Sequence, residues 1–257
     1  MVTQVSDDQR SDQQRELFEA IHDDYSAHYY DQYATAYRDR FLHAAIFNDL
    51  DLGGKQFAEI MCGDGPLTAY LKQQGTNTEI EGYDISPSAC RAYEEKTGCK
   101  GVPLNIVTEQ LPSGRYDVIG VSGGLHHVAH DLETVFGNIH RALKPGGFLV
   151  AFEPNARYML NGIRKIWYRS DRYFDDDNEA ALDPVKLSRQ FSPLFERRAL
   201  VYGGGPAFFT VYNSLILRLP LGLKRYYSPP MIQLERLWNL LPTPYFHGYF
   251  VAQWRKL

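Results

Sequence analysis

Short apolar runs alternate with amphipathic segments from Lys55 to Phe152, and glycine, proline, aspartate or serine residues separate them. Short runs that are apolar throughout are typical of parallel strands buried on both faces, whereas the amphipathic segments are typical of helices. The pattern predicts five strands, at Phe57–Met61, Glu79–Tyr83, Gly101–Leu104, Tyr116–Val121 and Gly147–Phe152. Repeated βαβ units of this kind form an open α/β sheet that binds ligands at the carboxyl ends of its strands.

Start and stop signals locate three helices between these strands. One follows Pro66, and a second begins at Ser86-Pro87, where serine caps the helix and proline takes its first position. A third is expected from about Asp131 to Leu143, because the Lys-Pro-Gly-Gly sequence at 144–147 cannot continue a helix.

Upstream of the sheet, apolar residues recur at helical spacing from Leu17 to about Leu50, and predict two helices broken near residues 27–30. The stripe is mostly aromatic and comprises Phe18, Ile21, Tyr25, Tyr29, Tyr33, Tyr37 and Phe41. Its simplest interpretation is one apolar helix face packed against the sheet. Residues 1–16 are polar and without periodicity, and we expect them to be a flexible leader.

The last hundred residues differ from the rest in charge. Residues 171–179 are acidic, but from Glu196 onward about eight basic residues face two acidic ones. Strands expected at Phe195–Tyr202 and Tyr245–Trp254 would close the sheet as a hairpin. Between them, large apolar side chains are mixed with arginine and lysine, which indicates either a covering subdomain or a surface that meets a hydrophobic or membrane-associated acceptor.

Composition excludes several classes of protein. The 257 residues carry a formal charge of −4, so no global basic field favours nucleic acid as a partner. Cys62, Cys90 and Cys99 are odd in number and lack CxxC spacing, which favours reduced thiols in a cytoplasmic protein and predicts no metal site. No stretch of about 18 apolar residues predicts a membrane span.

The first candidate site is the glycine turn after the first strand. A dinucleotide fingerprint that began at Gly63 would need glycine where Thr68 stands, and Glu59 precedes Gly63 by four residues. A carboxylate there can accept a hydrogen bond from an amine. Asp84 ends the second strand about nineteen residues beyond Gly65, and its carboxylate can bind both hydroxyls of a ribose.

An acid followed by three residues and G-x-G resembles the first motif of class I S-adenosylmethionine-dependent methyltransferases, and the resemblance extends from about Tyr25 to Glu153. It implies a Rossmann-like, doubly wound, mostly parallel seven-stranded sheet with a C-terminal antiparallel hairpin. It also implies S-adenosylmethionine as cofactor and S-adenosylhomocysteine as product. Met61 departs from the family, where most members have glycine. The cofactor-binding residues implied are Glu59, Gly63 and Gly65 for the methionine part, Asp84 for the ribose, Ile85, Asn105 and Ile106 for the adenine, and Ser122.

The second candidate site follows the fourth strand, in residues 122–128, Ser-Gly-Gly-Leu-His-His-Val. A neutral imidazole there can accept the proton of an acceptor hydroxyl as the methyl group moves, since the pKa of histidine lies near working pH. We favour His127 over His126. Glu153 ends the fifth strand and either orients His127, binds the acceptor, or only caps a loop. A histidine pair with such an acid resembles some sugar and natural-product O-methyltransferases.

The resemblance also implies that residues 17–52 form a helical lid over the cofactor. An aromatic ring near the sulfonium would add cation–π stabilisation. Tyr33 is the first candidate and Tyr29 the second. The methyltransferase domain would span residues 53–257, with acceptor-side inserts at about 155–190 and 203–242.

The sequence therefore predicts a methyltransferase that acts on an oxygen or nitrogen of a small molecule, either a sugar, a natural product or an amphipathic acceptor. The alternatives are a noncatalytic cofactor-binding partner protein and, behind it, a dinucleotide-dependent oxidoreductase. A homo-oligomer and peripheral contact with a membrane are both compatible with the sequence, and neither is chosen by it.

Overall fold

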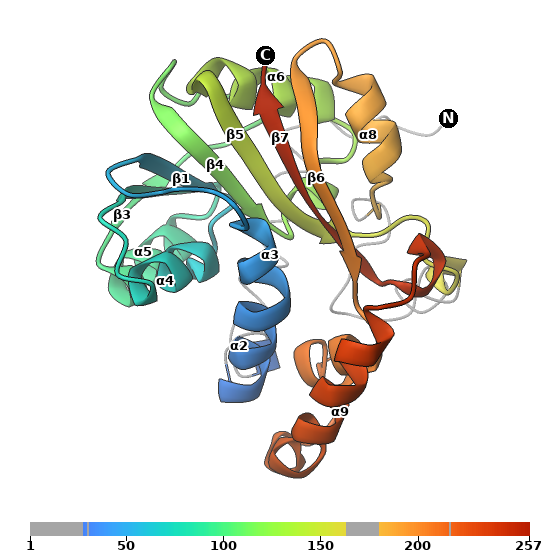
Figure 1. Cartoon of the computed structure of the whole chain (residues 1–257). Coiled ribbons are helices and arrows are strands. Elements are labelled where there is room, and N and C mark those ends of the chain that lie inside the picture. Colours follow the sequence, from blue (N-terminus) through green and yellow to red (C-terminus); the bar gives the residue numbers. More distant parts are fainter. Residues whose placement is uncertain (1–27, 30, 163–179, 216) are drawn as a thin grey trace, which may run out of the picture.

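The computed structural model describes residues 28–29, 31–162, 180–215 and 217–257. Its centre is one seven-stranded sheet in the order β3-β2-β1-β4-β5-β7-β6 (Figure 1). The strands are β1 (Gln56–Ile60), β2 (Glu79–Asp84), β3 (Lys100–Pro103), β4 (Tyr116–Ser122), β5 (Leu143–Pro154), β6 (Phe195–Gly203) and β7 (Tyr249–Lys256). Strands β1 to β5 are parallel, and β7 lies antiparallel between β5 and β6. The predicted Rossmann-like sheet with antiparallel C-terminal strands is confirmed.

Helices cover both faces of this sheet. The longer elements are α2 (Gln32–Arg38), α4 (Pro66–Gln73), α5 (Pro87–Thr97), α6 (Leu132–Ala142), α8 (Pro184–Gln190) and α9 (Lys224–Trp238). A π-helical turn, η1 (Asp39–His43), joins α2 to α3 (Ala44–Ile46), and a second, η3 (Phe208–Tyr212), precedes α9. The predicted start of α5 is confirmed, since the Ser86 hydroxyl accepts a hydrogen bond from the Ala89 amide at 3.3 Å.

Two predicted strand starts were wrong by four residues. Strand β5 begins at Leu143 rather than Gly147, because Leu143 pairs with Tyr116 across an irregularity and so extends the strand through the segment that ends α6. Strand β7 begins at Tyr249 rather than Tyr245. The residues before it form a 3-10 turn, η5 (Pro244–Phe246), whose first amide donates to the Thr243 hydroxyl.

The described part of the N-terminal region begins immediately before α2. Asp31 caps this helix by accepting hydrogen bonds from the amides of Tyr33 and Ala34, at 2.8 and 3.0 Å. The buried rings of Tyr29 and Tyr37 pack on the same apolar cluster as the half-buried Tyr33. The interpretation of the stripe as a core-facing surface holds for these residues. The predicted leader at 1–16, the helix expected at 17–27 and Tyr30 lie outside the described residues.

The core is divided by the sheet into two clusters. One packs α6 and α8 against β4, β5 and β7, around Phe136 and Trp254. The other packs α2, α3, α4 and η3 against the opposite face, around Tyr37 and Phe57. Figure 1 shows α2 and α9 beyond the carboxyl ends of the parallel strands. The candidate residues therefore lie at the edge of the sheet that these two helices approach.

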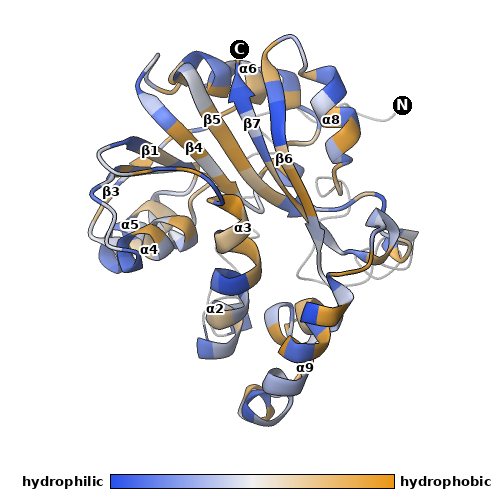
Figure 2. Ribbon diagram, in the orientation of Figure 1, coloured by the Kyte–Doolittle hydropathy of each residue, from blue (hydrophilic) through white to orange (hydrophobic). Residues whose placement is uncertain are grey.

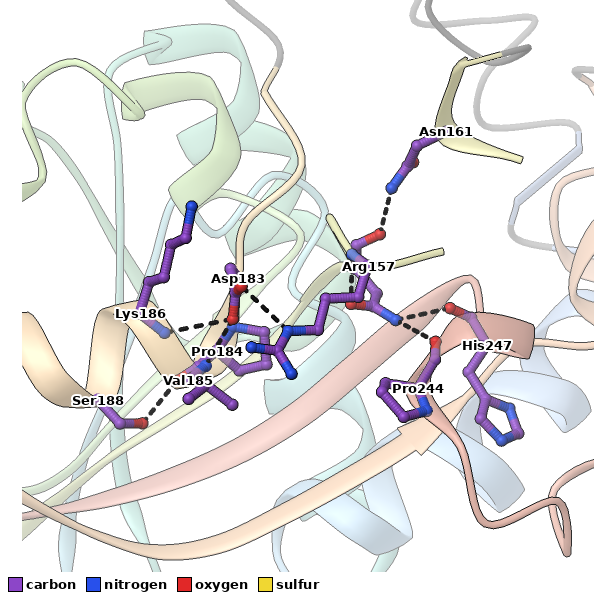
Figure 3. A network of polar contacts seen from close by, with 10 residues as sticks. Arg157, Asn161, Asp183, Pro184, Val185, Lys186, Ser188, Pro244 and His247 are labelled. Atoms are coloured by element: carbon purple, nitrogen blue, oxygen red, sulfur yellow. Dashed lines mark hydrogen bonds and ion pairs between the residues drawn. The ribbon is translucent and has the colours of Figure 1, made fainter. Parts of the chain in front are cut away.

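A polar network fixes the chain where it leaves β5 (Figure 3). The buried amide of Asn155 donates to the carbonyl oxygens of Pro244 and His247, at 2.8 and 2.9 Å. Asp183 caps α8 and also pairs with the Arg157 guanidinium at 3.0 Å. These contacts hold both sides of the acceptor-side insert predicted at 155–190; its residues 163–179 are outside the described part of the chain.

Candidate active site

The turn after β1 has the backbone conformation that glycine favours at three positions. Met61, Gly63 and Gly65 have φ of 52°, 47° and 75°. A Cβ atom on Gly65 would lie 2.7 Å from the side chains of Tyr93 and Thr97, so only glycine fits there. Met61 departs from the resembled family in its side chain but keeps a glycine-like backbone, at the cost of some strain.

The Met61 side chain also connects this turn to the loop after β4. A Cβ atom on Gly124 would lie 2.5 Å from the Met61 sulfur, which means that the thioether rests directly on the Gly124 backbone. The predicted cofactor loop and the predicted acceptor loop are therefore in van der Waals contact.

Glu59 is buried in β1 and anchors the start of α4. Its two carboxylate oxygens accept hydrogen bonds from the amides of Leu67 and Thr68, at 3.0 and 2.9 Å, and from the Thr68 hydroxyl at 2.7 Å. The positive end of the helix dipole favours a carboxylate at this place. Burial nevertheless raises the pKa of Glu59 to about 7. Its contact with the amine of the cofactor stays a prediction.

Asp84 joins the ends of β1 and β2. One carboxylate oxygen accepts a hydrogen bond from the Gly63 amide at 3.0 Å, and the other accepts one from the Ser86 amide at 2.9 Å. Burial raises the pKa of this carboxyl. The predicted ribose-binding acid is thus fixed beside the predicted methionine-binding glycine, and Ile85 follows it half-buried.

The two residues predicted at the adenine edge have different surroundings. The Asn105 side-chain oxygen accepts a hydrogen bond from the Val107 amide at 3.0 Å, which forms a tight local turn. Ile106 is buried in the core cluster that lies under α6. Their contact with adenine stays a prediction.

Glu153 is completely buried at the end of β5 and holds the loop after β4. Its carboxylate accepts hydrogen bonds from the amides of Gly124 and Leu125, at 3.0 and 2.7 Å, and a longer one of 3.3 Å from His126. The Nδ1 atom of His126 lies 2.7 Å from the same carboxylate. Burial raises the pKa of Glu153 to about 7, and the nearby His127 opposes that shift.

The structure therefore pairs Glu153 with His126, whereas the sequence favoured His127 as the base and gave its orientation as one of three roles for Glu153. The reason is local, because a 3-10 turn, η2 (Leu125–Val128), directs the first of the two histidines toward β5. The His127 ring packs against the His126 ring with their centroids 4.0 Å apart. One carboxylate and two imidazoles thus form a single cluster.

The remaining predicted residues are Ser122, Tyr29 and Tyr33. Ser122 is half-buried at the end of β4 and pairs with Phe152 of β5. The Tyr29 hydroxyl donates to the Asn213 side chain at 2.8 Å, and its ring meets Tyr212 edge-on. Tyr29 thereby contacts the second predicted insert, at about 203–242, which we call the C-terminal insert. The cofactor contacts predicted for Ser122, Tyr29 and Tyr33 stay predictions.

Two buried charged residues, Arg38 and Glu235, lie outside the predicted set and connect α2 to other parts of the fold. Arg38 ends α2, donates to the Tyr29 carbonyl oxygen at 2.8 Å, and lowers the pKa of Glu59 by its positive charge. Glu235 on α9 accepts hydrogen bonds from the Tyr37 hydroxyl at 2.6 Å and from the amides of Gly205 and Ala207, both at 2.9 Å. The predicted lid is therefore tied to the C-terminal insert. The sequence feature that could have selected Glu235 is its position as an isolated acid within a basic segment.

Among the described residues, no three or more histidine, cysteine, aspartate or glutamate side chains are grouped so as to hold a metal ion. Within the same ranges, no helix combines the length and the apolar character needed to cross a bilayer.

Comparison with known proteins identifies the domain. Residues 58–149 match a family model described as a methyltransferase domain. A demethylmenaquinone methyltransferase of Thermus thermophilus is 26% identical over 119 residues, which is 44% of this chain and 54% of the relative. A ubiquinone biosynthesis O-methyltransferase of Pseudomonas aeruginosa is 31% identical over 118 residues, covering 44% and 50%. The chain thus spans about half the length of the curated relatives it matches.

A solved structure of similar architecture is geranyl diphosphate C-methyltransferase of Streptomyces coelicolor, in complex with Mg²⁺, geranyl diphosphate and S-adenosyl-L-homocysteine. Its TM-score is 0.57 at 13% identity, and the match covers 84% of this chain and 78% of that one, which shows the fold. The prediction of a methyltransferase is confirmed in this form: residues 58–149 match a methyltransferase domain, and the chain has the Rossmann-like fold of that solved methyltransferase structure.

Proposed function

We propose that this chain binds S-adenosylmethionine at the carboxyl ends of β1 and β2 and transfers its methyl group to an oxygen of a small-molecule acceptor. The observation that carries the proposal is the hydrogen bond between the Gly63 amide and the Asp84 carboxylate, which joins the two predicted cofactor motifs in one place. The glycines of the turn allow the backbone to approach a ligand closely, and the Asp84 carboxylate suits a ribose diol. The residues present thus fit the cofactor.

The cofactor supplies a methyl group on a sulfonium, and the protein supplies alignment. Most of the acceleration would come from holding the acceptor in line with that methyl, with a smaller part from proton transfer. When Glu153 is ionised, it can accept a hydrogen bond from the Nδ1–H of His126, and the lone pair of that ring is then on Nε2. This geometry supports His126 as the base that takes the acceptor proton. His127, packed on it, remains the candidate favoured by the sequence.

The names of the relatives support an acceptor that carries a ring and an oxygen, as in quinone biosynthesis. The two predicted acceptor-side inserts, at about 155–190 and 203–242, offer aromatic surface for such a molecule. The ring of Tyr158 in the first stacks on that of Phe209 in the second, with their centroids 5.6 Å apart. A nitrogen acceptor is the second candidate, because the same imidazole would accept its proton.

The first test is calorimetric titration of the folded chain with S-adenosylhomocysteine, with Asp84→Ala and Glu59→Gln alongside. Micromolar binding that Asp84→Ala removes would support the cofactor site and open an acceptor screen on prenylated and unprenylated phenols. The absence of binding to a folded wild type would overturn the proposal. Binding without turnover of any acceptor, together with capture of a protein, would favour the noncatalytic alternative.

A further inference from the structure

The segment 217–246, which contains α9 and the turns on either side of it, exposes an unusual amount of apolar surface. Leu237 and Leu240 are 66% and 76% exposed, and Tyr226 is 65% exposed. Further exposed apolar residues precede and follow the helix, namely Leu221, Leu223 and Tyr245. Isolated exposed leucines are ordinary, but a run of them within thirty residues marks an interaction surface.

The outward side chains of α9 form two parallel stripes. Tyr226, Pro230, Leu234 and Leu237 recur at spacings of four, four and three, so they share one face of the helix. The buried residues of α9, among them Ser228 and Glu235, lie on the opposite face. Next to the apolar stripe run Arg225 and Arg236, both exposed. Figure 2 shows these mixed apolar and polar positions on α9, at the end of the molecule away from the C-terminus.

Charge in this segment is one-sided. Residues 217–246 contain four basic residues and one acidic residue, which gives +3, whereas the whole chain carries −4 and the remaining residues therefore −7. The single acid, Glu235, is buried, and so is Lys224, which pairs with Asp31. The outward charges of the segment are thus arginines alone. Apolar side chains interleaved with arginine suit a surface that is apolar inside and anionic at its edge.

The exposed residues are held firmly by their buried neighbours. Glu235 is bonded to Tyr37 and to the amides of Gly205 and Ala207. The Trp238 indole donates to the Phe246 carbonyl oxygen at 2.8 Å, which fixes the turn that follows α9. A partner would therefore meet a preformed surface and would not have to order it, which reduces the entropic cost of binding.

We propose that α9 and its flanking turns form a docking surface for the face of an anionic lipid bilayer. The surface lies beyond the carboxyl ends of the parallel strands, on the side of the candidate active site (Figure 1). Docking would therefore bring the acceptor side of the protein to the membrane. The inference concerns binding, and it adds to the proposed function a route by which a lipid-like acceptor reaches the site.

A bilayer fits the observations better than a second copy of this chain. Two copies that met through this face would bring like-charged arginines together without an outward acid to compensate them. Anionic headgroups would instead pair with the arginines while the leucines enter the region between headgroups and acyl chains.

The test is flotation of the full chain with large unilamellar vesicles of phosphatidylcholine, with and without about 30 mol% phosphatidylglycerol. We expect at least about tenfold stronger binding to the anionic vesicles, and weaker binding in high salt. Leu237→Asp/Leu240→Asp should reduce binding more than about tenfold. Arg225→Glu/Arg236→Glu should remove the preference for anionic vesicles, since each arginine near such a surface changes partitioning by about fivefold.

The matched controls are Leu257→Asp and Arg198→Glu. Leu257 is 67% exposed and the Arg198 side chain 51% exposed, and neither belongs to the segment. Both should bind vesicles as the wild type does. Binding of S-adenosylhomocysteine, measured on every variant, separates the two proposals: vesicle binding without it would contradict only the proposed function.

Three results would overturn the inference. One is a folded wild type that does not float with anionic vesicles, and another is flotation that the Leu237→Asp/Leu240→Asp variant retains. The third is a stable dimer in analytical ultracentrifugation that this variant dissociates, which would assign the surface to a second copy.

Discussion

Glu59 and Glu153 are the penultimate residues of β1 and β5, the two strands that flank β4. Both carboxylates are fully buried, and burial raises the pKa of each to about 7. Both also accept hydrogen bonds from backbone amides, of α4 for Glu59 and of the loop after β4 for Glu153. They differ in their side-chain partner. Glu59 bonds the Thr68 hydroxyl, which does not titrate near neutral pH, whereas Glu153 bonds the His126 imidazole, which does.

This difference makes Glu153 and His126 a candidate proton relay, a role that the side-chain partner of Glu59 does not offer. A buried carboxylate that accepts hydrogen bonds from loop amides positions α4 in one place, whereas in the other it also contacts an ionisable ring at the candidate acceptor site. An acid at the end of a strand is therefore not evidence of catalysis until its partners are known.

The largest effect on stability is expected when Glu59, which anchors α4, is replaced by an apolar residue. Glu59→Leu would leave the amides of Leu67 and Thr68 and the Thr68 hydroxyl without their acceptor in a buried place. We expect the free energy of unfolding in urea to fall by about 4 kcal/mol. Thr68→Val, which removes only one donor, should cost about 1 kcal/mol. Equal losses in the two variants would contradict the anchoring role.

The pH dependence of stability tests whether both glutamates carry the same ionisation cost. A carboxyl whose folded pKa is about 7 binds its proton more tightly than in the unfolded chain, so stability falls as pH rises from about 4.5 to about 7. Each group can contribute up to about 3 kcal/mol to this loss. In Glu59→Gln, the urea midpoint should change less with pH across that range than in the wild type. If Glu153→Gln leaves the slope unchanged, the two neighbouring histidines offset the ionisation cost of Glu153.

The catalytic rate should depend more on Glu153 than on Glu59. Glu153→Gln keeps the shape of the carboxylate but removes its charge, so it should lower kcat by about 100-fold, whereas Glu59→Gln should lower kcat only a few-fold. His126→Ala combined with Glu153→Gln should be no slower than the worse single variant, because the two act as one unit. Steady-state kinetics and S-adenosylhomocysteine titration on the same preparations separate rate from cofactor binding. Full activity of Glu153→Gln would end its assignment as part of a relay.

The local elements of this protein could be predicted from its sequence, but the partners of its buried acids could not. The apolar runs, the glycine turn and the position of Asp84 follow from patterns within a few residues, and the structure has them where they were expected. The choice between His126 and His127 depends on one residue of offset in a 3-10 turn. The bond between Tyr37 and Glu235 spans 198 positions, and nothing local in either segment indicates it.

The contact between the two loops that these glutamates position gives the smallest effect. Gly124→Ala would place its Cβ about 2.5 Å from the Met61 sulfur and should cost about 2 kcal/mol of stability through overpacking. Met61→Gly removes that sulfur and the strain of its φ of 52° but also loses packing, so alone it should change stability by less than about 1 kcal/mol. The double variant should recover most of the Gly124→Ala loss, because the clash needs both side chains. Additive losses in a urea double-mutant cycle would show that Met61 does not rest on Gly124 in solution, and that the two loops are not coupled through this contact.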